Sequence, residues 1–136
     1  MNRDAQRTGS YRDLLVWQKG MDLVVKSYEI AKHLPSSETY GLASQIQRAA
    51  VSVPANIAEG YGRHHRGDYL HHLSVANGSL KELETHFLIA QRVSYLRDDQ
   101  IHSLLELTSE LGRMLRALSQ RLRGNAGGTS PRIAST

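Results

Sequence analysis

The chain has 136 residues, 40% of them hydrophobic and 22% charged, which suits a single globular domain with a buried core. It contains no cysteine, so a disulfide framework and a thiolate metal site are excluded, and a reducing cytoplasm is the expected compartment. No signal peptide is visible in residues 1–10, and no apolar run approaches the roughly 20 residues that span a bilayer, so we expect no membrane partner.

The net charge of +4 is concentrated towards the end of the sequence. Residues 1–110 carry twelve Lys or Arg and thirteen Asp or Glu, whereas no acid follows Glu110. The basic residues of this last part are Arg113, Arg116, Arg121, Arg123 and Arg132. A one-sided excess of this kind attracts polyanions such as RNA, DNA or acidic lipid headgroups. The alternative is a solvated helix end whose arginines interact favourably with the helix dipole.

Residues 1–10 are expected to form a flexible arm that precedes the first helix. Asp13 is the predicted N-cap, and Pro35 ends the helix because proline disfavours helical geometry in the residue before it. Apolar residues at spacings of three and four predict the buried face: Leu14, Trp17, Met21, Val24, Tyr28 and Ala31. Because Trp17 lies on this stripe, we interpret it as a core or interface anchor rather than a platform for stacking a base.

The second helix is predicted from about Tyr40 to about Glu59, after a short connection. Its core stripe consists of Leu42, Ile46, Ala50, Val53 and Ile57. Pro54 lies inside this segment, where it removes a backbone hydrogen bond and bends the helix. The stripe stays in phase across Pro54, which favours one kinked helix over a new helix capped by Ser52.

A polar line runs along the same helix and contains Arg48, Ser52, Asn56 and Glu59. We interpret it as a structural hydrogen-bond network at a helix junction, in which Asn56 covers a backbone carbonyl that Pro54 leaves free. Glu59 has no partner carboxylate, nucleophile or metal ligand at a suggestive spacing. The sequence therefore assigns no catalytic residue, and we do not expect an enzyme.

The second connection, residues 60–67, contains glycines that supply positive φ for a helix C-cap. It is not a phosphate-binding loop, because no strand precedes it and the Lys-Ser/Thr pair is missing. Nearby lie His64, His65, His71 and His72, with Asp68 among them. A zinc site needs three or four converging ligands, whereas adjacent histidines on a helix point about 100° apart. We therefore predict no metal and no cofactor.

The third helix is predicted from an N-cap at Asp68 to about Val93. Its core positions are Tyr69, Leu73, Ala76, Leu80, Leu83, Phe87 and Ala90, and Leu70, Leu88 and Ile89 widen the stripe. Gly78 interrupts the helix at a cost of about 1 kcal/mol relative to alanine, which suggests that another backbone approaches closely there.

The fourth helix begins after residues 97–99, with Asp98 or Asp99 as its cap. A seven-residue pattern follows and favours left-handed bundle packing: Ile101, Leu104, Thr108, Leu111, Leu115, Leu118 and Leu122. From Gly124 onward the composition shifts to small and polar residues, so residues 124–136 are predicted to be a disordered tail.

Four amphipathic helices with short connections and no strand pattern predict an all-α fold over residues 11–123, an up-down-up-down antiparallel four-helix bundle. The second helix is apolar or small on several sides, and the third has a wide stripe. We therefore expect a homo-oligomer that buries this surplus apolar surface between subunits.

Several segments resemble the four-helix-bundle proteins encoded within intervening sequences of bacterial 23S ribosomal RNA genes. The most distinctive is Gln45–Gly60, and the others are Tyr11–Leu14, Val16–Lys19, Leu34–Pro35 with Glu38, Tyr40–Leu42, Gly78–Thr85 and Tyr95–Leu96. The resemblance implies an up-down bundle that assembles into a ring-shaped pentamer. It also implies a relation to the accessory bundles of diversity-generating retroelements, which bind a reverse transcriptase and nucleic acid through a basic surface.

Together, the charge pattern and the resemblance predict a non-enzymatic, oligomeric bundle that binds RNA or other nucleic acid electrostatically. The candidate phosphate contacts are Arg3, Arg7, Arg12, Arg113, Arg116, Arg121 and Arg123. The alternative is a protein-interaction scaffold, or an accessory subunit of a nucleic-acid enzyme such as a reverse transcriptase.

Overall fold

A computed structural model describes residues 9–124. Four long helices dominate it: α2 (Leu15–Ala31), α3 (Leu42–Tyr61), α4 (Arg66–Arg92) and α5 (Asp98–Gly124). Two short 3₁₀ helices, η1 (Tyr11–Asp13) and η2 (Ser36–Glu38), precede α2 and α3. Residues 9–124 contain no strand, which confirms the predicted all-helical class with four helices. Residues 1–8 of the expected arm and 125–136 of the expected tail lie outside the described residues.

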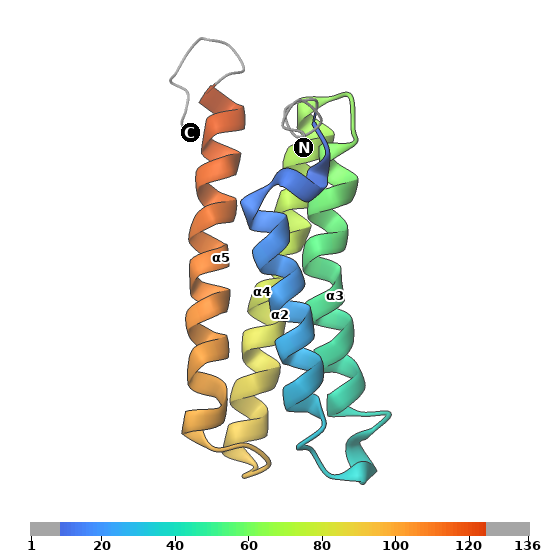
Figure 1. Cartoon of the computed structure of the whole chain (residues 1–136), viewed down its shortest axis with the longest axis vertical. Coiled ribbons are helices and arrows are strands. Elements are labelled where there is room, and N and C mark those ends of the chain that lie inside the picture. The colour runs from blue at the N-terminus through green and yellow to red at the C-terminus, as the bar shows by residue number, and fades with distance from the viewer. Residues whose placement is uncertain (1–8, 125–136) are drawn as a thin grey trace.

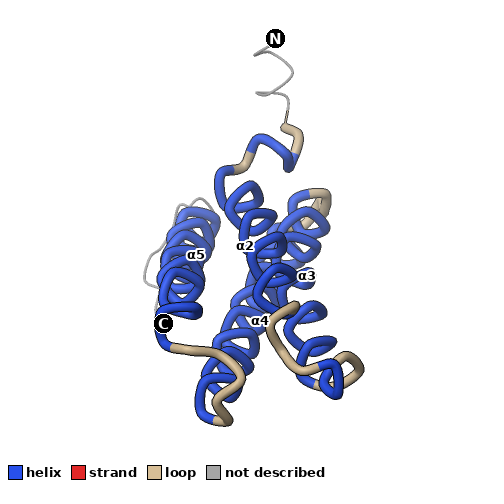
Figure 2. The backbone as a smooth tube through the Cα atoms, turned by 60° about the horizontal axis from the view of Figure 1, so that its bottom comes forward, coloured by secondary structure: helices blue, strands red, loops and turns tan. Residues whose placement is uncertain are grey.

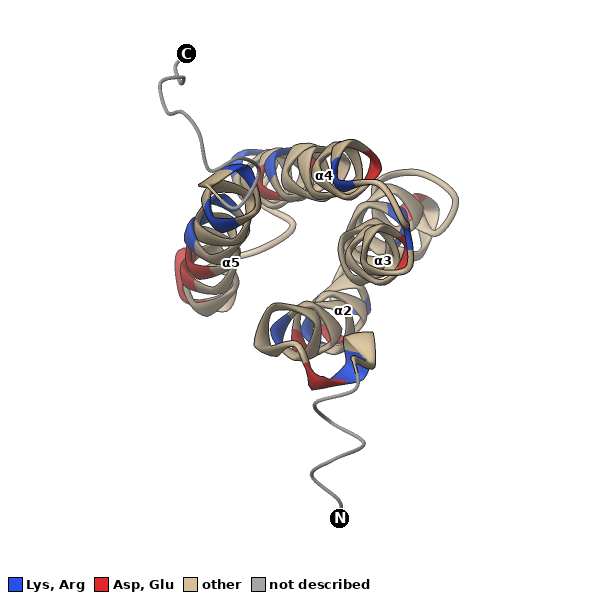
Figure 3. Cartoon of the chain, turned by 90° about the horizontal axis from the view of Figure 1, so that it is seen from above, with Lys and Arg blue, Asp and Glu red and all other residues tan. Residues whose placement is uncertain are grey.

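The four long helices lie side by side along the long axis of the molecule (Figures 1 and 2). The α2–α3 and α4–α5 connections lie at one end, and the α3–α4 connection lies at the other, together with the end of α5 (Figure 1). Viewed from above, the helices follow one another around the bundle in chain order (Figure 3). The contact between α3 and α4 is the most extensive, and α5 packs less extensively on α4 and α2.

The core is aliphatic apart from Phe87, in keeping with the low aromatic content, and its centre is fully buried. Each long helix contributes to it: the largest fully buried side chains include Leu23, Ile46, Phe87 and Leu111. Full burial of such a side chain stabilises the fold by about 1.5–3 kcal/mol relative to exposure. The stripes predicted for α3 and α5 lie on the buried faces, although Leu118 and Leu122 at the end of α5 are only partly buried.

The buried face predicted for α2 is wrong in part. Met21 and Tyr28 are 41% and 42% exposed, whereas Leu23 and Ile30 are buried. The true face includes two small residues, Gly20 and Ser27, between its larger apolar residues. These two small residues let neighbouring helices approach closely. Because neither is a large apolar residue, the hydrophobic pattern alone favoured the other side of the helix.

Some expected helix ends also differ. The helix after η1 begins at Leu15 with Leu14 at the N-cap, so Asp13 does not cap it. Asp68 lies in the first turn of α4, and His65 occupies the N-cap. Gly62 ends α3 at φ −81° and needs no positive φ, unlike Ser94, which follows α4 at φ 67°.

One continuous helix spans Pro54, as predicted. A glycine makes room for the proline: a Cβ at Gly20 of α2 would lie 3.3 Å from Pro54 Cβ. The close approach expected at Gly78 is absent, because nothing within the described part of the chain lies within 4 Å of a Cβ placed there. The tightest helical glycine is instead Gly60, where an added Cβ would lie 2.8 Å from His72 Cβ.

Candidate functional site

A chain of polar side chains crosses the α3–α4 interface. Ser79 Oγ of α4 donates to Ser52 Oγ of α3 at 2.8 Å, and Asn56 Nδ2 donates to the same Ser52 oxygen at 3.0 Å. His72 Nδ1 lies 3.0 Å from Asn56 Oδ1, which can only accept, so this ring nitrogen carries the proton. Because 52 pairs with 79 and 56 with 72, the two helices run in opposite directions. All four groups are partly or fully buried.

Only half of the predicted polar network is present. Arg48 has no hydrogen-bond partner among the described residues and lines an exposed groove beside Gln45 and Glu82. Glu59 is exposed and forms an ion pair with Arg63 at 2.8 Å, one turn along α3. The expectation that Asn56 covers the carbonyl freed by Pro54 is also wrong. That carbonyl belongs to residue 50, and Asn56 Nδ2 donates to the Ser52 carbonyl at 2.9 Å.

The two partners that complete the network, His72 and Ser79, come from α4, and sequence reasoning missed both. The signal that could have found them is that a histidine and a serine seven residues apart lie on one face of α4, two helical turns from each other. Identifying these two residues required the register between α3 and α4, which the residue pattern of one helix does not give. The network consists of amide, hydroxyl and imidazole groups that hydrogen-bond to one another, an arrangement that fixes the interface.

The remaining histidines do not converge. His64, His65 and His71 are exposed, and the His71 and His72 rings meet edge-on with centroids 5.7 Å apart. No group of three or more potential metal ligands occurs among residues 9–124. His86 lies elsewhere on α4 and is buried; its Nε2 is 3.6 Å from a carboxylate oxygen of Glu82.

The candidate nucleic-acid contacts are unevenly placed. Arg3 and Arg7 lie outside the described residues, and Arg12 is exposed in η1. The remaining four form what we call the arginine segment of α5, and all are exposed: Arg113, Arg116, Arg121 and Arg123. The Lys and Arg positions of α5 lie apart from its acidic positions, which belong to the earlier turns (Figure 3). An exposed positive segment with no acid in its own turns attracts phosphates.

Sequence reasoning missed that the α3–α4 connection lies at the same end of the bundle as the last turns of α5 (Figure 1). Arg63 in this connection and Arg66, the first residue of α4, lie there, and both are exposed. We call this end, with Arg12, Arg63, Arg66, Arg121 and Arg123, the basic end. Burial raises the pKa of Tyr69 there, as does the neighbouring Tyr61, whereas the positive charge of Arg121 acts in the opposite direction. The alternation of connections in a bundle was the signal that could have found these residues.

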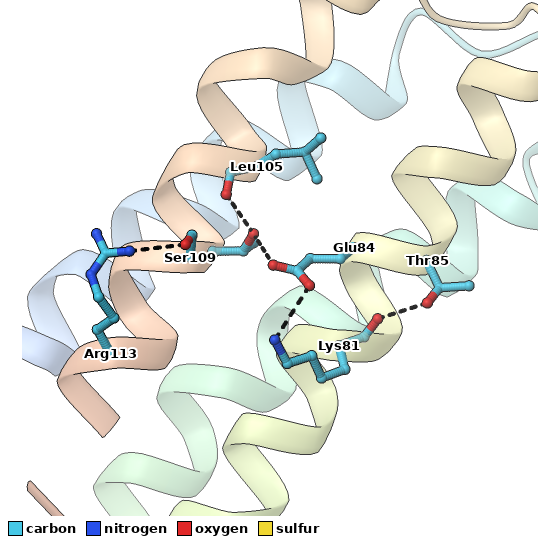
Figure 4. Close-up of polar contacts among 7 residues, drawn as sticks. Lys81, Glu84, Thr85, Leu105, Ser109 and Arg113 are labelled. Atoms are coloured by element: carbon cyan, nitrogen blue, oxygen red, sulfur yellow. Dashed lines mark hydrogen bonds and ion pairs between the residues drawn. The ribbon is translucent and has the colours of Figure 1, made fainter. Parts of the chain in front are cut away.

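The earlier turns of α5 are fixed to α4 by a buried hydroxyl (Figure 4). Thr108 Oγ1 donates to Glu84 Oε2 at 2.6 Å and lies 3.0 Å from the Leu105 carbonyl. Glu84 also faces Lys81 at 3.7 Å. Arg113 Nη1 donates to Ser109 Oγ at 3.0 Å within α5. Beyond Arg113, no side chain of α5 hydrogen-bonds to another described helix.

Three further polar contacts join the helices and their connections. Lys19 of α2 forms an ion pair with Glu110 of α5 at 3.2 Å. Tyr95, in the α4–α5 connection, donates to Glu38 Oε2 at 3.0 Å, and the Leu42 backbone N–H donates to Glu38 Oε1 at 2.9 Å. The Leu42 and Tyr95 hydrogen bonds lower the pKa of the Glu38 carboxyl, and the same carboxylate raises the pKa of Tyr95.

No helix within residues 9–124 combines the length and hydropathy that a bilayer span requires.

Comparison with known proteins identifies the family. Residues 12–117 match the family described as 23S rRNA-intervening sequence protein. The fold is similar to a crystal structure from Bacteroides thetaiotaomicron, described as a protein with unknown function from the S23 ribosomal protein family. The TM-score is 0.73 at 23% identity, covering 78% of this chain and 99% of that one. No curated protein matches. Since the family match spans most of the sequence, the chain belongs to the 23S rRNA-intervening sequence proteins.

Proposed function

We propose that the protein is a non-enzymatic, cytoplasmic RNA-binding bundle, which contacts phosphates through the arginine segment of α5 and the basic end. The observation that carries this proposal is the run Leu111–Gly124, in which four exposed arginines are accompanied by no acid. The family's name, with its reference to 23S rRNA, supports RNA as the polyanion. Arg12, and Arg3 and Arg7 ahead of it in the sequence, are the remaining candidate contacts.

We propose further that the up-down-up-down bundle is the protomer of a ring-shaped homopentamer. Exposed apolar side chains on α2 and α4 support assembly, among them Leu15 and Val25 at 57% exposure and Ile89 at 44%. Repetition of the arginine segment around a ring would multiply weak phosphate contacts. Multi-angle light scattering should then give a mass near five times 15.2 kDa, and a monomer at micromolar concentration would contradict the assembly.

RNA binding is tested by the salt dependence of affinity for a labelled 23S rRNA fragment. Each phosphate contact contributes about 0.7–0.9 to the slope of log affinity against log salt. The variant R113Q/R116Q/R121Q/R123Q should therefore lower that slope by about 3. A matched control, K26Q/K32Q/K81Q/R92Q, removes the same charge from exposed residues elsewhere and should keep most of the slope. Absent or salt-independent binding by the unaltered protein would refute RNA binding.

The second candidate is a protein-interaction scaffold, or an accessory subunit of a nucleic-acid enzyme such as a reverse transcriptase. It is favoured by the exposed apolar residues of α4 and its C-cap: Val75, Leu88, Ile89 and Val93. Under this alternative, the four arginine substitutions leave function intact, whereas Leu88→Glu and Ile89→Glu abolish partner binding without unfolding the chain. If the arginine substitutions abolished RNA binding and the apolar substitutions did not, the scaffold alternative would be refuted.

A further inference from the structure

The groove between α4 and α5 differs from the surfaces around it. Two members of the arginine segment, Arg116 and Arg123, line it, and its described lining contains no acid. A second groove, lined by earlier turns of α5, contains Arg113 together with Glu106 and Glu110. The four arginines of α5 are therefore not equivalent: two face a groove without carboxylates, one shares a groove with two acids, and Arg121 lines neither.

The spacing of the two groove arginines suits a chain of phosphates. Seven residues separate Arg116 from Arg123, which places their Cα atoms about 10.5 Å apart along one face of the helix. Polar side chains from both helices lie beside them: Ser74, Asn77, Ser119 and Gln120. Hydroxyl and amide groups of this kind hydrogen-bond to phosphate, sugar and base edges.

The floor of the groove is apolar, since Leu70, Leu73 and Leu115 line it. Leu115 and Leu73 are buried at the junction of α4 and α5, and Leu70 is partly buried. A hollow with one accessible apolar side chain, Leu70, and with cationic and polar walls suits a strand whose bases lie toward Leu70 while its phosphates face the arginines. Nucleobases have apolar faces that protein surfaces recognise when a strand is unpaired.

The size of the groove decides whether a single strand or a duplex can enter it. The groove has a volume of about 240 Å³, which is too small for a duplex to enter, whereas part of a single strand can. A duplex would have to lie across the outer surfaces of the helices, where Arg113 and Arg121 are as close to it as the groove arginines. We propose that the α4–α5 groove binds a single-stranded nucleic acid, with Arg116 and Arg123 contacting successive parts of its phosphate backbone.

This inference rests on the proposed RNA binding, and paired variants separate the two. Fluorescence anisotropy with a labelled 12-nucleotide single-stranded RNA compares R116Q/R123Q with R113Q/R121Q. Both variants lose two charges from the same exposed segment, so bulk electrostatics and folding are matched. Loss of two single-strand contacts should weaken binding about 25-fold at 0.1 M salt and lower the salt slope by about 1.4. The R113Q/R121Q variant should lose less than about fivefold.

Three outcomes bear on the proposal. The expected asymmetry between the two variants, with the single strand bound more tightly than a duplex of equal length, supports the groove. Preference for the single strand is informative because a duplex has the higher charge density and wins under simple charge attraction. Equal losses in both variants, or preference for the duplex, would overturn the groove and leave RNA binding in place. No binding of any RNA by the unaltered protein would refute RNA binding itself.

Discussion

The α3–α4 pair and α5 occupy the same bundle but are held in it differently. Between α3 and α4, small residues allow close approach, and the bonds among Ser52, Asn56, His72 and Ser79 fix the register. Along α5, the polar contacts with α4 are those of Asp98 at its start and of the buried Thr108 hydroxyl, and the last turns are only partly buried. The helix pair with the most extensive contact is thus also fixed by a polar network, whereas the candidate binding surface lies on α5, the helix with the looser attachment.

The largest difference in stability is expected between alanine substitutions at two buried helical glycines, Gly60 and Gly112. A Cβ at Gly60 would lie 2.8 Å from His72 Cβ and 3.0 Å from the Tyr69 ring, so Gly60→Ala should lower the free energy of unfolding by about 2 kcal/mol. At Gly112 of α5 the nearest atoms would be 3.6 Å away. Gly112→Ala should therefore raise stability by about 0.5–1 kcal/mol through helix propensity. Urea unfolding followed by circular dichroism measures both, and equal destabilisation would contradict the difference in packing.

The second prediction concerns the polar chain of the tight interface. Asn56→Ala removes hydrogen bonds to Ser52 and His72 in a partly buried site and should cost about 1–2 kcal/mol. Glu59→Ala, three residues further along α3, removes only an exposed ion pair and should cost less than about 0.5 kcal/mol. If thermal unfolding gave the two variants the same loss, the network would not hold the interface.

A smaller effect is expected where α5 is attached. Thr108→Val keeps the shape of the side chain but deletes the donor to Glu84, and it should cost about 1 kcal/mol. Ser109→Ala, on the exposed side of the same turn, should change stability by less than about 0.5 kcal/mol. A Thr108→Val variant as stable as the unaltered protein would mean that this hydrogen bond does not contribute to the attachment of α5.

The smallest effect depends on pH and concerns the end opposite the arginines. The pKa of Glu38 is lowered in the folded protein, chiefly by the Leu42 N–H and then by Tyr95. Its ionised form therefore adds stability above the ordinary Glu value of 4.5, and this is lost as the pH falls through the lower folded value. The Tyr95→Phe variant should have a lower melting temperature than the unaltered protein at pH 7, and this difference should disappear in acid. A difference in melting temperature that persists at pH 2 would contradict the role of the ionised Glu38 carboxylate.

The helices were predictable because each has a continuous amphipathic period and is bounded by proline, glycine or acidic residues. The wrong face of α2 shows the limit: Gly20 and Ser27 are buried because they are small, and a hydrophobic count does not register size. The α4 members of the polar network, His72 and Ser79, could not be predicted from the sequence, because a hydrogen bond between two helices depends on how the helices align. The arginines of α5 were found from charge alone, whereas their division between a groove and open surface required the position of α4.

The contact between Gly20 and Pro54 has an evolutionary consequence. With a Cβ at position 20 only 3.3 Å from Pro54 Cβ, the two positions constrain each other across α2 and α3. Substitution at one alters which residues selection accepts at the other, so the pair should vary together among homologues. Lineages that keep the proline should retain glycine opposite it, whereas lineages that replace the proline with a slimmer residue are free to acquire alanine or serine in α2.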